Sequence, residues 1–125
     1  MTESTTLRVL FVDDEEELVS AVVERLEIRG VSARGVTSGV DALRLIDSDE
    51  FDVVVIDVKM PGLGGLGLIR RIKARRPDLQ VVLLSGHGSP EDAEEGMRLG
   101  AFDYLMKPVN IDTLISILRR AAGGR

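Results

Sequence analysis

The sequence predicts an α/β fold: a doubly wound, five-stranded parallel sheet with helices on both of its faces. Short apolar runs alternate with segments of helical periodicity along the 125 residues. The runs at residues 53–56 and 81–84 contain no polar side chain, which is typical of parallel strands covered on both faces. In such a fold the crossovers are right-handed, and ligands bind beyond the carboxyl ends of the strands.

Each predicted strand is followed by a predicted helix. The strands occupy residues 7–12, 31–36, 53–56, 81–84 and, with a weaker signal, 103–106. The first helix carries the apolar stripe Leu18, Val22 and Leu26, and it ends at Gly30, which suits a left-handed C-terminal cap. The stretch "S-G-V-D", which begins at Ser38, is a capping box that starts the second helix.

The third helix is predicted to follow a loop at Gly64 and Gly65. It contains Gly67, which costs about 1 kcal/mol relative to alanine inside a helix. Before Pro77 it holds a basic cluster that we interpret as a solvated face complementing the helix dipole. The cluster consists of Arg70, Arg71, Lys73, Arg75 and Arg76.

The last two helices have their own start signals. "S-P-E-D" from Ser89 supplies a cap, a proline at the first helical position and acidic residues in the first turn. Asn110 is the expected cap of the fifth helix. That helix has the apolar stripe Ile111, Leu114, Ile115 and Leu118.

Composition narrows the function classes. The chain contains no cysteine, which excludes disulfides, thiolate metal sites and cysteine nucleophiles. A formal net charge of -5 opposes direct binding to nucleic acid. No apolar run reaches membrane-spanning length, and the polar start "M-T-E-S-T-T" has no secretory pattern, so we expect a cytoplasmic protein that does not associate with membranes.

Charged and polar residues follow the strands, where this fold places its chemistry. Asp13 and Asp14 follow the first strand, Asp57 the third, Ser85 the fourth and Lys107 the fifth. Each also has an ordinary alternative interpretation. The first two aspartates are candidate helix caps, Asp57 and Ser85 are candidate turn residues, and Lys107 is a candidate solvated lysine.

Electrostatics favours a shared site over these separate alternatives. Two unit charges about 4 Å apart interact by about 4 kcal/mol at an effective dielectric of about 20, so three clustered carboxylates need a cation. Mg²⁺ suits a site that offers carboxylates, a loop carbonyl and water. Three carboxylates, one divalent cation and Lys107 sum to zero charge.

Four blocks of the sequence resemble the signature blocks of the receiver domain of two-component response regulators. They are "V-L-F-V-D-D-E", "V-V-V-I-D-V-K-M-P-G-L-G-G", "V-V-L-L-S-G-H" and "G-A-F-D-Y-L-M-K-P". The resemblance covers residues 7–122 and implies the flavodoxin-like strand order 2-1-3-4-5. It leaves residues 1–6 as a disordered tail and residues 123–125 as a C-terminal tail or the start of a linker.

The resemblance also implies roles for individual residues. Asp57 corresponds to the phosphoacceptor, and Asp14, Asp57 and the backbone carbonyl of Lys59 correspond to the Mg²⁺ ligands. Asp13 corresponds to the second residue of the acidic pocket. Ser85 corresponds to the hydroxyl that holds the phosphoryl oxygens.

Lys107 corresponds to the ammonium that holds the phosphoryl oxygens together with that hydroxyl, and Tyr104 to the aromatic switch residue. Lys59 and His87, each two positions beyond a site residue, are expected to flank the path of hydrolytic water. Both are therefore candidates for tuning the phosphoryl lifetime.

The function implied is phosphorylation-dependent signalling. A sensor histidine kinase or a histidine phosphotransfer protein would donate the phosphoryl group, and a downstream protein target or a missing output domain would respond. The chain would promote its own phosphorylation and slow autodephosphorylation without turning over a substrate. The alternative is a receiver-like interaction module that is no longer phosphorylated.

Two unrelated functions fit the sequence less well. A flavodoxin-type electron carrier needs a phosphate cradle after the first strand, where this chain has "V-D-D-E-E-E". A haloacid-dehalogenase-type phosphatase has a second aspartate two residues after its nucleophile, and Lys59 occupies that place here.

Overall fold

The computed structural model describes residues 6–86 and 90–123, and these form one five-stranded parallel sheet with five helices. The strands are β1 (Arg8–Val12), β2 (Ser32–Val36), β3 (Val53–Asp57), β4 (Gln80–Ser85) and β5 (Asp103–Met106). The helices are α1 (Glu16–Ile28), α2 (Gly39–Ser48), α3 (Gly64–Arg75), α4 (Pro90–Arg98) and α5 (Ile111–Gly123). The strand order is β2-β1-β3-β4-β5, which confirms the predicted doubly wound topology.

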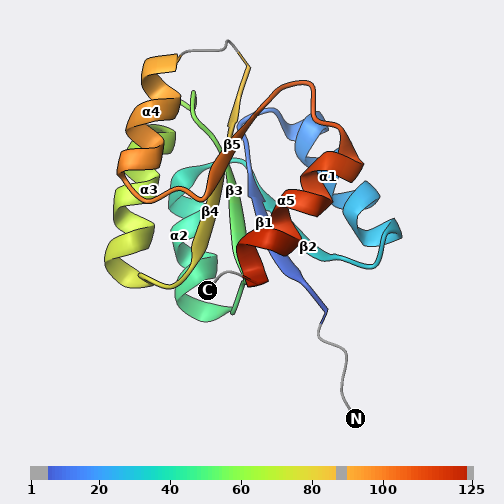
Figure 1. Ribbon diagram of the computed structural model, residues 1–125. Coiled ribbons are helices and arrows are strands. Elements are labelled where there is room, and N and C mark those ends of the chain that lie inside the picture. The colour runs from blue at the N-terminus through green and yellow to red at the C-terminus, as the bar shows by residue number, and fades with distance from the viewer. Residues whose placement is uncertain (1–5, 87–89, 124–125) are drawn as a thin grey trace.

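The helices form a layer on each side of the sheet (Figure 1). Helices α1 and α5 pack over one face, around Phe11, Val55 and Leu84, while α2 and α3 cover the other face, around Leu10 and Ile56. Every residue of β3 is buried, because this strand lies between β1 and β4 and is covered from both sides. The apolar runs therefore become strands for the reason that the sequence suggested.

Several predicted helix ends are confirmed. The Ser38 hydroxyl accepts a hydrogen bond from the Asp41 backbone N–H at 3.1 Å, and the Asn110 side chain accepts one from Thr113 at 3.0 Å. Gly30 adopts φ +84°, the left-handed conformation expected after α1. The cap expected at Ser89 lies outside the described residues.

The predicted start of the third helix is wrong by a few residues. Gly64 and Gly65, expected in a loop, are the first residues of α3. Gly65 packs directly against the chain that follows β3, and its N–H donates to the Val58 carbonyl at 3.1 Å. The small size of Gly65 allows the helix to begin against the backbone of Asp57 and Val58.

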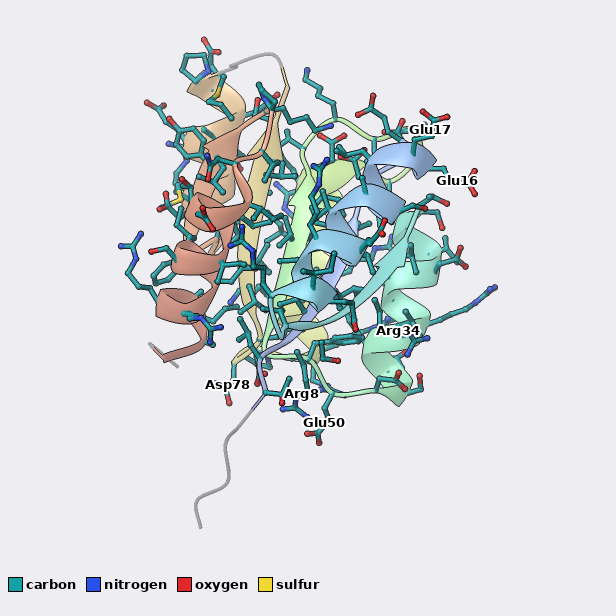
Figure 2. The ribbon with its side chains drawn as sticks, turned by 90° about the vertical axis from the view of Figure 1, so that its right-hand side faces the viewer. Arg8, Glu16, Glu17, Arg34, Glu50 and Asp78 are labelled. Carbon is teal, nitrogen blue, oxygen red and sulfur yellow. The ribbon has the colours of Figure 1, made fainter. Side chains whose placement is uncertain are left out.

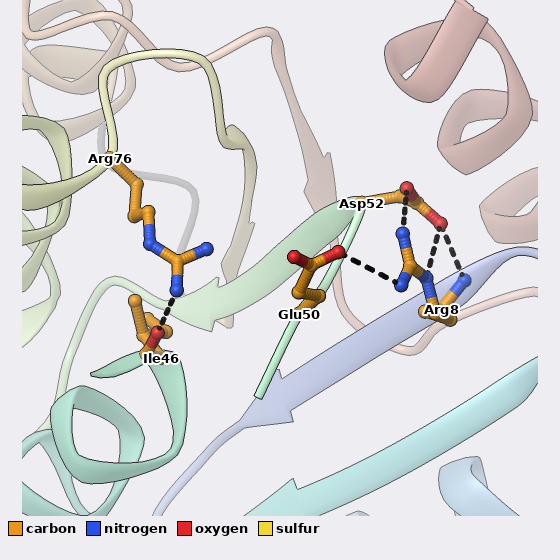
Figure 3. Close-up of polar contacts among 5 residues, drawn as sticks. All are labelled: Arg8, Ile46, Glu50, Asp52 and Arg76. Atoms are coloured by element: carbon orange, nitrogen blue, oxygen red, sulfur yellow. Dashed lines mark hydrogen bonds and ion pairs between the residues drawn. The ribbon is translucent and has the colours of Figure 1, made fainter. Parts of the chain in front are cut away.

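The basic cluster is exposed at Arg70, Arg71 and Arg75, as predicted for a solvated face, but most of its members also have acceptors on the protein. Arg76 donates to the Ile46 carbonyl at the end of α2 at 2.7 Å (Figure 3), and Lys73 donates to the Leu79 carbonyl at 2.9 Å. Arg70 and Arg75 pair with acidic residues, at 3.7 Å from Glu95 and 3.4 Å from Asp47. Most of the cluster thus joins α3 to its neighbours.

At the amino-terminal edge of the sheet, the buried carboxylate of Asp52 is paired with Arg8. Arg8 donates its backbone N–H to Asp52 at 2.9 Å, and its guanidinium lies 3.2 Å from Asp52 and 3.4 Å from Glu50 (Figure 3). Figure 2 places Arg8, Glu50 and Asp78 at the opposite end of the molecule from Glu16 and Glu17. None of the helices within residues 6–86 and 90–123 has the length and hydrophobicity needed to cross a bilayer.

The two glycines at 65 and 67 give a stability test. A Cβ at Gly65 would lie 2.4 Å from the Asp57 carbonyl oxygen, whereas one at Gly67 would meet only the flexible Leu63 side chain, at 3.0 Å. We expect Gly65→Ala to lower the free energy of unfolding by about 1–3 kcal/mol through overpacking. The matched Gly67→Ala should raise it by up to about 1 kcal/mol through helix propensity. Urea unfolding measures both, and equal effects of the two changes would contradict this packing.

Candidate functional site

The carboxyl edge of the sheet brings most of the predicted site residues together. Asp57 and Ser85 are the last residues of β3 and β4, and Asp13 and Lys107 directly follow β1 and β5. Backbone hydrogen bonds continue beyond the strands and fix these positions. The Lys107 N–H donates to the Ser85 carbonyl at 2.9 Å, and the Asp13 N–H donates to the Val36 carbonyl at 3.3 Å.

Three carboxylates converge at this edge. Asp13 and Asp57 are buried, at 0% and 4% exposure, while Asp14 is exposed. One oxygen of each lies within 4.8 Å of the others. Because buried carboxylates are costly unless they are paired, such a cluster is unfavourable for folding alone and needs positive charge.

The donor set fits a hard divalent cation. It consists of carboxylate oxygens only, which Mg²⁺ prefers, and the exposure of Asp14 leaves room for the waters that Mg²⁺ retains. Asp13 Oδ2 is buried and makes no aligned hydrogen bond within the described residues, so it can serve as a ligand atom. Lys59 reaches the site through its N–H, which donates to Asp57 Oδ1 at 3.2 Å. Its carbonyl as a further ligand stays a prediction.

The ammonium of Lys107 is the positive charge that the chain itself supplies. Its Nζ lies 2.9 Å from Asp13 Oδ2, 3.1 Å from Glu15 Oε1 and 3.4 Å from Asp57 Oδ2. The contact with Asp13 is an ion pair by distance, although its geometry is not that of an aligned hydrogen bond. Lys107 is therefore not the solvated lysine of the ordinary alternative.

Glu15 was not among the predicted site residues. The run "D-D-E-E-E" after β1 contains three consecutive glutamates, and nothing in the sequence indicates that the first of them reaches the site. Only the packing of the segment after β5 against the start of α1 brings Lys107 to Glu15.

The structure also decides between the cap and site interpretations of the aspartates. The N-cap of α1 is Glu15, whose side chain makes no capping hydrogen bond, so the cap predicted as an alternative at Asp14 is wrong. Asp13 and Asp57 each have two uses. One oxygen of each accepts an N–H two residues ahead, from Glu15 at 3.0 Å and from Lys59 at 3.2 Å, and the other oxygen faces Lys107.

These surroundings shift two pKa values. Burial raises the pKa of Asp57, the charge of Asp13 raises it further, and the Lys59 N–H and Lys107 only partly oppose this rise. Burial alone would lower the pKa of Lys107, but its bonds to Asp13 and Glu15 and the surrounding negative charge raise it overall. The site therefore holds a lysine that stays protonated beside a carboxylate whose negative charge is unfavourable.

A cavity of about 650 Å³ adjoins the site between α1 and the segment after β5. Its lining combines Asp57, Lys59 and Lys107 with apolar side chains that include Leu18 and Val109. A cavity of about 710 Å³ lies at the opposite edge, but there the carboxylate of Asp52 is already paired with Arg8. The smaller cavity is therefore the one that adjoins the carboxylate cluster.

The remaining predicted residues lie around the cluster. The Lys59 ammonium lies 3.4 Å from Asp92 Oδ2 on α4, so it extends toward that helix. Tyr104 is 41% exposed on β5, two residues before Met106, which pairs in register with the buried Ser85. His87 lies outside the described residues.

Comparison with known proteins identifies relatives over nearly the whole chain. The family model for the response regulator receiver domain matches residues 9–119. The C4-dicarboxylate transport transcriptional regulatory protein DctD of Rhizobium meliloti (strain 1021) is 36% identical, over 90% of this chain and 25% of its own length. The DNA-binding transcriptional regulator NtrC of Escherichia coli (strain K12) is 34% identical, over 90% of this chain and 24% of its own length.

Solved structures agree with these relatives. The receiver domain of NtrX from Brucella abortus superimposes with a TM-score of 0.88 at 35% identity, covering 94% of this chain and 99% of that one. This chain spans about a quarter of the length of the curated relatives that it matches. By the match of the family model over residues 9–119 and by these relatives, the chain belongs to the response regulator receiver domain family.

Proposed function

We propose that the chain is a phosphorylation-dependent switch that accepts a phosphoryl group on Asp57 in the presence of Mg²⁺. The observation that carries this proposal is the contact of one lysine with two buried carboxylates, Asp13 and Asp57, beside the exposed Asp14. This edge has a nucleophile, a set of hard ligands and a fixed cation, which are the parts that phosphoryl transfer needs.

In this mechanism, Asp57 attacks the phosphorus of a phosphohistidine on a partner protein. A bond forms between a carboxylate oxygen and phosphorus as the bond from phosphorus to imidazole nitrogen breaks. The Lys59 N–H holds Asp57 Oδ1 in place, and Lys107 offers its charge to the phosphoryl oxygens. A magnesium ion held by Asp13, Asp14 and Asp57 would neutralise further negative charge on those oxygens.

The partners follow from this chemistry and from the relatives. The donor is a sensor histidine kinase or a histidine phosphotransfer protein, and the cavity beside Asp57 gives it a partly apolar surface to approach. The relatives DctD and NtrC are transcriptional regulators about four times as long, so an output domain or a separate protein target would receive the signal. Direct DNA binding by this domain is disfavoured by its net charge of -5.

We expect no catalytic turnover of a separate substrate. The carboxylate that would form the acyl phosphate is the one that carries the signal, so the chain acts on itself. The module that is no longer phosphorylated remains the alternative. The cluster of Asp13, Asp14 and Asp57 beside Lys107 favours a domain that is still phosphorylated. An apolar contact would serve the stability of the fold better than such a cluster does.

We also propose that Lys59 and His87 tune the lifetime of the phosphoryl group on Asp57. For Lys59, the contact with Asp92 adds a condition, since its ammonium would have to leave α4 before it could lie across the path of water.

Phosphorylation itself gives the first test. Acetyl phosphate should label the wild-type chain only when Mg²⁺ is present, and Asp57→Asn should abolish the label because the nucleophile is gone. Phosphate-affinity gels or intact mass measure the label, and circular dichroism provides the control for folding. Stoichiometric label on Asp57→Asn at the wild-type rate would overturn the assignment.

Stability without metal gives the second test. Because burial and Asp13 disfavour the charge on Asp57, Asp57→Asn should raise the urea midpoint at pH 7 in EDTA. The folded pKa lies above the ordinary 3.8, so the unfavourable contribution is absent below about 3.8 and grows as the pH rises through the folded value. The gain should therefore be smaller at pH 4 than at pH 7.

Adding Mg²⁺ should stabilise the wild type more than the variant, because the variant has lost one charged ligand. A lower midpoint for Asp57→Asn in EDTA at pH 7 would contradict the unfavourable charge that we assign to Asp57.

The route of the signal gives the third test. A phosphoryl group would draw the Ser85 hydroxyl toward it, and Tyr104 could then move inward from the surface of β5. Beryllofluoride, which mimics the phosphoryl group, should shift the backbone amide NMR signals of α4 and β5 as well as those of the metal pocket. Tyr104→Ala should reduce the shifts on α4 and β5 and leave the pocket shifts. Wild-type shifts confined to the pocket would refute this route.

A further inference from the structure

Lys107 has a third acidic partner besides the two buried aspartates. Its Nζ is nearer to Glu15, at 3.1 Å, than to Asp57, at 3.4 Å. Glu15 and Asp57 accept hydrogen bonds from the ammonium, and Asp13 pairs with it by distance. A new acceptor, such as a phosphoryl oxygen, would therefore have to share the ammonium with carboxylates that already surround it.

Exposure indicates which partner would yield. The Asp13 side chain is fully buried and that of Asp57 is 5% exposed, so both lie on the inner side of Lys107. The Glu15 side chain is 63% exposed, so it lies on the solvent side, from which a phosphoryl group arrives. Leaving Asp13 without its cation would strand a buried charge, whereas Glu15 can return to water at little cost.

Glu15 is also free to move. It is the N-cap residue of α1, but its side chain makes no capping hydrogen bond, so releasing Lys107 does not uncap the helix. Glu15, Asp57 and Lys107 line the same cavity. The Glu15 backbone N–H donates to Asp13, but its side chain contacts the site through Lys107, while Asp13, Asp14 and Asp57 supply the three clustered carboxylates.

We propose that Glu15 is a positioning residue that holds Lys107 in a displaceable ion pair and competes with the phosphoryl oxygens for its ammonium. The proposal rests on the proposed function, in which Lys107 serves the phosphoryl group on Asp57. Glu15 thereby keeps Lys107 in place before phosphorylation. It also slows phosphorylation, because free energy is needed to displace Glu15 from the ammonium.

The test compares two neighbouring substitutions that remove the same charge. Glu15→Gln weakens the hold on Lys107, and Glu16→Gln is the matched control in the first turn of α1. With acetyl phosphate in saturating Mg²⁺, Glu15→Gln should be phosphorylated about two- to five-fold faster than wild type, the range expected from a partly exposed ion pair. Glu16→Gln should stay close to wild type. A rate for Glu15→Gln at or below the wild-type rate would overturn the competition.

The Lys107→Ala background separates a contact from a general charge effect. If Glu15 acts through Lys107, Glu15→Gln should have no further effect on the rate in that background. An undiminished acceleration would overturn the proposal, because it would come from charge alone. If Lys107→Ala fails to fold, the comparison between Glu15→Gln and Glu16→Gln still decides.

A second readout needs neither metal nor phosphoryl donor. The ¹³Cε signal of Lys107, assigned by its loss in Lys107→Arg, should move in Glu15→Gln and stay in Glu16→Gln when recorded in EDTA. An unchanged signal in Glu15→Gln would overturn the contact alone and leave the proposed function standing. Failure of the wild type to be labelled at all would instead overturn the proposed function, and the competition with it.

Discussion

The structure depends on one electrostatic constraint at the carboxyl edge of the sheet: Asp13 and Asp57 are buried side by side. Their strands, β1 and β3, are paired in register up to Val12 and Ile56, so the residues that follow are neighbours. The chain offsets this repulsion with a lysine that follows β5, 50 positions after Asp57. The pocket therefore forms only when the whole sheet is assembled, and its charge balance is a property of the tertiary fold.

The opposite edge of the sheet shows what a purely structural solution looks like. Asp52 is also buried, at 6% exposure, but Arg8 gives it a backbone N–H and two guanidinium contacts. A guanidinium is a planar fork that matches a carboxylate, whereas an ammonium is a point charge that is easily shared and redirected. Arg8 therefore holds Asp52 in a fixed geometry, whereas Lys107 is shared among three carboxylates.

Sequence reasoning predicted what depends on local pattern and missed what depends on contact between distant segments. The strands and the residues after them follow from apolar runs and from the shape of a doubly wound sheet, whereas the strand order was implied by the resemblance to receiver domains. The start of α3 was missed because it depends on the packing of Gly65 against the backbone of Asp57 and Val58, a contact that no residue pattern indicates. The contacts of Arg76 with Ile46, Lys59 with Asp92 and Lys107 with Glu15 were missed because long cationic side chains reach several acceptors, and only packing selects among them.

The side chains around Asp57 differ in how strongly they are held. The aspartates are held firmly, whereas Lys59 and Lys107 each have a contact that is weak. The aspartates are held by strands and by backbone N–H groups, in which each lost hydrogen bond would leave a buried group unsatisfied. Lys59 is instead joined to Asp92, and Lys107 to Glu15, by pairs with at least one exposed member, and such pairs contribute about 1 kcal/mol or less each. A phosphoryl group brings about two negative charges, enough to redirect either lysine while the aspartates stay in place. Phosphorylation would thus act by exchanging the partners of two lysines, of which Lys59 reaches α4 and Lys107 follows directly on β5.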